Sequence, residues 1–108
     1  MSQRPRKRKL PAAAVTTEVL LRLYVAGAAP NSVLAIANLE AICREHLKDG
    51  YQLEVVDVLE HPRRAMADGV LVTPSLSKLS PGPASNVVGN LSDKAKVLLA
   101  LGMRGKAR

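Results

Sequence analysis

Apolar residues recur along the chain with two different periods, and these periods predict the order of its elements. Four apolar residues occupy every second position of the first patterned segment, residues 18–26: Val19, Leu21, Leu23 and Val25. A period of two is typical of a β-strand. The positions between them are also mostly apolar and are interrupted by Arg22. A strand that is apolar on both faces is usually central in a sheet covered by helices, so we expect this strand in the middle of such a sheet.

The second patterned segment has the period of a helix. Apolar residues recur three or four positions apart up to residue 48: Ala35, Ile36, Leu39, Ile42, Cys43 and Leu47. Pro30 suits the start of this helix, and Asn31 or Ser32 is expected to cap its first N–H groups. Gly50 suits its end, because glycine readily adopts the left-handed conformation that follows many helices.

Shorter elements follow, and their order predicts the fold. Residues 53–58 are expected to form a second strand, parallel to the first because a long helix joins the two. The remaining expected elements are a short helix at 61–67, a third strand that begins at or after Pro74, an antiparallel fourth strand at 86–89, and a final helix capped by Ser92 with Ala95, Leu98, Leu99 and Gly102 facing inward. The order β-α-β-α-β-β-α is that of the thioredoxin-like α/β fold, in which the proline at the start of the third strand usually follows a cis bond.

Charge divides the chain into a domain and two tails. The net charge of +7 in 108 residues arises at the ends, because five basic residues precede Leu10 and three follow Met103, whereas eight basic and nine acidic residues lie between them. We therefore predict a disordered basic tail at 1–16, a domain at 17–103 and a basic C-terminal tail at 104–108. The domain lacks a basic stripe and a run of aromatic residues, so an alternative role in nucleic-acid binding rests on the tails.

The residues that redox chemistry of the thioredoxin type needs are missing. Such enzymes place Cys-x-x-Cys at the start of the first helix, where the helix N-terminus lowers the pKa of the thiol. Residues 26–31 here are Ala-Gly-Ala-Ala-Pro-Asn, and the single cysteine, Cys43, falls on the apolar stripe of the helix. A thioredoxin-like redox function is therefore kept only as an alternative.

Other catalytic or metal-binding arrangements are equally sparse. His46 and His61 lack the spacing to further ligands that a metal site requires. Asp57 ends a strand, where a carboxylate is more often hydrogen-bonded to a neighbouring loop than catalytic. No apolar run reaches the roughly 18–20 residues of a membrane-spanning helix, so we expect a soluble, cytoplasmic protein with no cofactor, metal or catalytic residue.

Several short motifs, in order between residues 18 and 103, together resemble the KaiB family of clock proteins. They are Leu-Tyr-Val-Ala-Gly at 23–27, Pro-Asn-Ser at 30–32, Asp-Val-Leu at 57–59 with Pro62, Leu-Val-Thr-Pro-Ser-Leu at 71–76, and Val-Gly-Asn-Leu-Ser at 88–92. No single motif is specific, but the set in this order and spacing is.

The resemblance implies a binding protein without enzymatic activity. KaiB proteins bind the N-terminal ATPase ring of the KaiC hexamer and regulate its phosphorylation state and output, for a circadian rhythm or a related timing response. A sensor kinase competes for the same ring, and cyanobacterial assemblies also capture KaiA. Here Ala84 and Ser85 replace basic residues of the family and the C-terminal end is basic instead of acidic, which argues against KaiA capture.

The partner contacts that we expect lie at the first loop and the start of the first helix. They comprise Ala26, Gly27, Pro30 and Asn31, together with the basic residues Arg22 and Lys78.

The resemblance also implies that the chain has two folds. KaiB proteins have a resting homo-oligomer, dimeric or tetrameric, with a rearranged C-terminal half, and a thioredoxin-like monomer that binds KaiC. We expect Pro74, Gly89, Ala100 and Gly102 to lie in the part that switches. The family often has Gly-Leu-Asp where residues 100–102 are Ala-Leu-Gly, and alanine is favoured over glycine in a helix by about 1 kcal/mol. We therefore predict the thioredoxin-like state, with residues 92–101 helical.

Overall fold

The computed structural model of the chain describes residues 18–48 and 50–102. The tails predicted at 1–16 and 104–108 lie outside the described residues.

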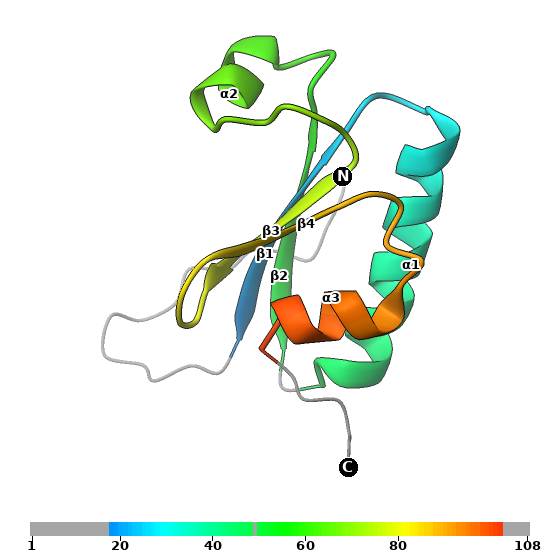
Figure 1. Ribbon diagram of the computed structural model, residues 1–108, viewed down its shortest axis with the longest axis vertical. Helices are drawn as coiled ribbons and strands as arrows, with labels where there is room; N and C mark the ends of the chain where they lie inside the picture. The colour runs from blue at the N-terminus through cyan, green and yellow to red at the C-terminus, as the bar shows by residue number, and fades with distance from the viewer. Residues whose placement is uncertain (1–17, 49, 103–108) are drawn as a thin grey trace.

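Within the described residues, four strands and three helices follow one another in the predicted order (Figure 1). They are β1 (Val19–Val25), α1 (Pro30–His46), β2 (Tyr51–Asp57), α2 (Pro62–Ala67), β3 (Ser75–Ser80), β4 (Ser85–Val88) and α3 (Lys94–Ala100). The predicted thioredoxin-like fold is therefore confirmed, including the helical state of the last segment.

The sheet has the strand order β2-β1-β3-β4, so β1 occupies a central position as predicted. β1 pairs with β2 in parallel, β1 pairs with β3 in antiparallel orientation, and β3 and β4 form an antiparallel hairpin. β3 starts directly after Pro74, and the Thr73–Pro74 bond is cis, as expected for this fold. The Ser80–Pro81 bond after β3 is also cis.

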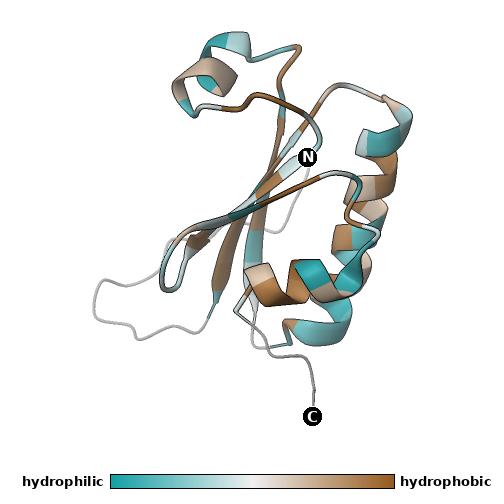
Figure 2. Ribbon diagram, in the orientation of Figure 1, coloured by the Kyte–Doolittle hydropathy of each residue, from teal (hydrophilic) through white to brown (hydrophobic). Residues whose placement is uncertain are grey.

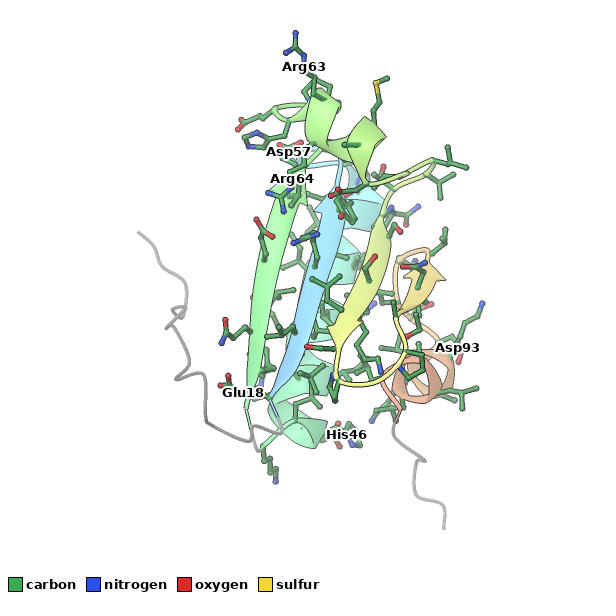
Figure 3. The ribbon with its side chains drawn as sticks, turned by 90° about the vertical axis from the view of Figure 1, so that its left-hand side faces the viewer. Glu18, His46, Asp57, Arg63, Arg64 and Asp93 are labelled. Carbon is green, nitrogen blue, oxygen red and sulfur yellow. The ribbon has the colours of Figure 1, made fainter. Side chains whose placement is uncertain are left out.

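The two longer helices, α1 and α3, lie on the same face of the sheet (Figures 1 and 3). The buried core lies between them and the sheet and contains Leu23, Leu39, Leu76 and Val97. Hydrophobic residues follow the strands of the sheet in Figure 2, as burial against these helices requires. Among the described residues, the opposite face carries α2 alone, at one end. The expectation of helices covering both faces is therefore correct for one face and wrong for most of the other, because Arg22 and Tyr24 find polar partners there instead.

Both predicted N-caps differ from the structure. Ala29 precedes α1 and provides no side-chain cap, whereas the hydroxyl of Ser32 accepts a hydrogen bond from the Ala26 N–H (3.0 Å). Asp93, not Ser92, caps α3, and its carboxylate accepts from the Lys96 N–H (3.1 Å).

The inward stripe of α3 also differs from the prediction. It consists of Val97, Leu98 and Leu101, whereas Ala95, Leu99 and Gly102 are exposed. None of the described helices is long and apolar enough to cross a membrane.

Candidate functional site

Two loops meet at the carboxyl ends of β1 and β2, and the carboxylate of Asp57 joins them. Its Oδ1 accepts hydrogen bonds from the N–H groups of Gly27 and Leu59, each at 3.0 Å. Gly27 has a φ of +54°, which favours glycine, and a Cβ there would lie 3.3 Å from the Leu59 side chain. The expectation that Asp57 is hydrogen-bonded to a neighbouring loop is confirmed.

Four of the six predicted contact residues lie together in this part of the molecule. Ala26 and Gly27 are half-buried in the loop after β1, and Pro30 and Asn31 are exposed in the first turn of α1. These residues have small or uncharged side chains, so the backbone largely determines the shape of this surface.

The other two predicted contact residues, Arg22 and Lys78, lie elsewhere. Lys78 is 6% exposed, is paired in register with Leu21 and donates from Nζ to the carbonyl oxygen of Pro81 (2.7 Å). In this fold its ammonium group is turned towards the β3–β4 turn and away from the loop after β1.

Sequence reasoning missed an exposed apolar area beside the two loops. We call it the end patch, and it consists of Leu59, Met66, Leu71 and Val72. Leu71 is 93% exposed and Met66 is 77% exposed. The signal that could have revealed it is the apolar run Val-Leu-Val at 70–72, which lies between a glycine turn and Pro74, before the third strand begins.

A cavity of about 280 Å³ opens within the end patch. Its lining residues are Val58, Pro62, Ala65, Met66, Val70, Leu71, Val72 and Thr73. The loop after β2, the helix α2 and the segment before β3 therefore enclose one apolar space, and Figure 2 shows the hydrophobic character of that last segment.

Helix α2 is held on the sheet by a polar network, which we call the α2 clamp: Arg22, Tyr24, Glu54, Arg64 and Asp68. Arg64 reaches from α2 over the sheet (Figure 3) and donates through both terminal nitrogens to the two oxygens of Glu54, each at 2.8 Å. Arg22 donates to Glu54 from Nε, also at 2.8 Å, and the hydroxyl of Tyr24 donates to Asp68 at 2.6 Å. Only Ala65 of α2 is buried, so polar contacts contribute a large share of its attachment.

The α2 clamp lowers the pKa of Glu54 from 4.5 to about 2, chiefly because Arg64 donates two hydrogen bonds to the charged form and secondarily because Arg22 donates a third. A carboxyl group whose pKa is lower in the folded state stabilises that state above its unfolded pKa, here near 4.5. This contribution disappears as the pH falls through about 2.

Glu54→Gln is expected to lower the free energy of unfolding by about 1 kcal/mol at pH 7, the upper end for partly exposed ion pairs, because Arg64 binds in bidentate fashion. Below pH 4.5 the difference from the wild type should shrink, and near pH 2 it should vanish. Urea unfolding at several pH values measures it. Glu40→Gln, an exposed change on α1, is the control and should show no such trend. A difference that does not depend on pH would contradict the role of Glu54.

The residues considered for redox or metal chemistry do not form a site in the described part of the chain. Cys43 is buried in the core, and no group of three or more His, Cys, Asp or Glu side chains within residues 18–48 and 50–102 could hold a metal ion. His46 lies beside Glu45, with 3.6 Å between the imidazole Nε2 and the carboxylate, at the end of the sheet far from Asp57 and Arg64 (Figure 3). His61 is exposed just before α2.

Burial raises the pKa of the Cys43 thiol from 9.0 to about 12. At pH 8.5 only on the order of one thiol in 10³ is then ionised in the folded chain. We expect iodoacetamide to modify Cys43 at least ~100-fold more slowly in the folded protein than in denaturant, because the thiolate is the reactive form. Mass spectrometry of timed samples measures this. Equal rates in both states would show that the thiol is accessible.

The four residues expected to take part in fold switching lie around β3, β4 and α3. The carbonyl oxygen of Pro74 accepts from the Gly89 N–H (2.9 Å), which joins the start of β3 to the end of β4. Ala100 ends α3, and its carbonyl oxygen accepts from the hydroxyl of Ser85 (2.5 Å). Gly102 follows with a φ of +83°.

The amino-acid sequence matches a known protein family and members of it. The KaiB domain family matches residues 22–103. The chain is 48% identical over 82 residues to the circadian clock oscillator protein KaiB of Rippkaea orientalis, which covers 76% of this chain and 79% of that protein. It is 46% identical over 83 residues to the circadian clock protein KaiB3 of a Synechocystis species, and this match covers 77% of this chain and 81% of that protein.

Solved structures confirm the thioredoxin-like architecture. The N-terminal domain of Synechococcus elongatus SasA superposes with a TM-score of 0.69 at 23% identity, over 94% of this chain and all of that domain. Chloroplastic thioredoxin z superposes with a TM-score of 0.67 at 19% identity, over 79% of this chain and 76% of that one. At these identities the structures show the fold alone. The family match and the two close relatives show more: the chain belongs to the KaiB family of non-enzymatic circadian clock proteins.

Proposed function

We propose that the protein binds the ATPase ring of a KaiC-type hexamer and thereby regulates its phosphorylation state and signalling output, acting in the cytoplasm. The observation that carries the proposal is the surface at the carboxyl ends of β1 and β2. There the loop after β1, fixed by Asp57, lies beside the exposed apolar residues of the end patch. Exposed apolar side chains that lie together on a small domain favour a protein-binding surface.

Two other functions are less well supported. A redox enzyme of the thioredoxin type needs a reactive thiol pair, whereas Cys43 is single and buried. A nucleic-acid-binding function would depend on the tails, because between Leu10 and Met103 acidic residues slightly outnumber basic ones.

Sedimentation velocity with the purified KaiC-type ATPase of the same host, with ATP, tests the proposal. We expect co-sedimentation of the wild type with the ring, and at least ~10-fold weaker binding of Ala28→Glu, which adds a charge to the exposed loop. The matched control is Ala41→Glu, the same change at an exposed position in the middle of α1. No binding of the wild type in any nucleotide or phosphorylation state would reject the proposal.

We further propose that a sensor kinase competes for the ring, that KaiA is not captured, and that a resting homo-oligomer with a rearranged C-terminal half exchanges with the thioredoxin-like state. Two packings of one sequence must then differ by only a few kcal/mol. Pro74, Gly89, Ala100 and Gly102 lie in the part that would change.

Ala100→Gly is expected to shift this equilibrium about fivefold towards the rearranged state, because glycine costs a helix about 1 kcal/mol relative to alanine. NMR peak volumes of the two forms measure the ratio. Ala41→Gly in α1, which belongs to the half that does not change, is the control and should lower stability without altering the ratio. An unchanged ratio in Ala100→Gly would count against switching in α3.

A further inference from the structure

The segment between α2 and β3 has unpaired backbone groups. Within the part of the chain that the structure describes, the N–H and C=O groups of Leu71, Val72 and Thr73 make no hydrogen bond. Their neighbours on either side do: the Val70 N–H donates to the Ala65 carbonyl (3.0 Å), and the Pro74 carbonyl accepts from Gly89. Backbone polar groups are seldom left without partners once water is excluded, so these six groups are available to another backbone.

The same three residues form one wall of the cavity in the end patch. Its volume of about 280 Å³ lies just below the range of about 300–1,000 Å³ typical of small-molecule sites. No charged side chain lines it, and Thr73 is its single polar residue. The cavity therefore has room for a leucine-sized apolar side chain and lacks the polar groups that would orient a cofactor.

We propose that an exposed loop of the partner ATPase pairs its backbone with residues 71–73 and inserts one leucine-sized apolar side chain into the cavity. This mode of recognition obtains affinity from main-chain hydrogen bonds and specificity from the pocket. Because residues 72–74 form a bend, the pairing is short and involves two or three residues of the partner. The inference deepens the proposed function and names the chemistry of the segment that is bound.

A probe that needs no ATPase separates this inference from the proposed function. In NMR titrations at millimolar concentration, N-acetyl-Ala-Leu-Ala-methylamide is expected to shift the amide signals of residues 71–73 and the methyl signals of Ala65 and Val70. N-acetyl-Ala-Ser-Ala-methylamide, which lacks the apolar side chain, should bind at least ~10-fold more weakly. Shifts at other residues, no shifts, or equal effects of the two peptides would overturn the inference even if the ring binds.

The complex with the ring provides the second test. Hydrogen exchange of the amides of residues 71–73 should slow at least ~10-fold on binding, and Leu71→Asp should weaken binding at least ~30-fold. Leu99→Asp on α3 is the matched control, because Leu99 is also highly exposed (74%) but lies outside the end patch. Unchanged exchange at these amides in a formed complex, or an equal effect of the two variants, would reject the inference. So would loss of self-association as the single consequence of Leu71→Asp, because a second copy of the chain would then be the occupant.

Discussion

Leu23→Ala is expected to lower the free energy of unfolding by about 2–5 kcal/mol. Leu23 is fully buried (0% exposed) on the central strand, in register with Leu76 of β3 and within the core below α1 and α3. Truncation of the side chain removes buried apolar area. It also leaves a cavity between the sheet and the two helices, which cannot move together to fill it without disturbing the rest of the core. Because the free energy of unfolding of a small domain is only about 5–15 kcal/mol, this variant loses a large part of the total stability.

Equilibrium urea denaturation followed by circular dichroism measures this loss. Leu20→Ala is the control, since Leu20 lies on the same strand but is half-buried and points to the opposite face. Its cost should be clearly smaller, about 1 kcal/mol, in proportion to the apolar area that it buries. Equal costs for the two variants would mean that the two faces of β1 contribute alike, against the one-sided core described above.

Asp57→Ala is expected to cost about 2 kcal/mol of stability and to weaken partner binding at least ~10-fold. The carboxylate accepts from the N–H groups of both Gly27 and Leu59, and hydrogen bonds to charged groups contribute about 1.5–3 kcal/mol each when buried. The bond to Leu59 is exposed and contributes less. Without the carboxylate, the loop after β1 and the loop after β2 lose their shared acceptor, so the binding surface loses its shape.

Asp57→Asn distinguishes geometry from charge. The amide oxygen of asparagine can still accept from both N–H groups, so this variant should retain most of the stability and most of the binding. Thermal unfolding and sedimentation with the ring measure the two effects. If the asparagine variant were as impaired as the alanine variant, the negative charge would matter and the loop geometry would not be the cause.

Most of the fold could be predicted from local signals. Alternation in β1, the helical period of α1 and Pro74 at the start of β3 each reflect burial or backbone constraints that act within a few residues. Their order along the chain then leaves few topologies, since parallel strands joined by a helix have a right-handed crossover. Residues 23–32 also indicated the loop that carries four of the predicted contacts.

The remaining features depend on residues that are far apart in sequence. Glu54 joins β2 to Arg64 on α2 and to Arg22 on β1, and no periodic pattern reveals such a network. For the same reason Arg22 was expected at a partner surface, although the structure pairs it with Glu54. The expected caps, Asn31 or Ser32 for α1 and Ser92 for α3, rest on residue preferences, which do not determine which N–H group a side-chain oxygen reaches.

The strand order also determines how the chain can be divided. A cut at the exposed Gly69 would leave β1, α1 and β2 in one fragment and β3, β4 and α3 in the other, so each fragment retains a complete strand pair. Two strands alone are marginally stable in water, so neither fragment should fold without the other. Reassembly has to restore the ladder between β1 and β3 and the core beneath it. The protein is thus suited to fragment complementation, in which recovered folding reports that two tethered molecules have met.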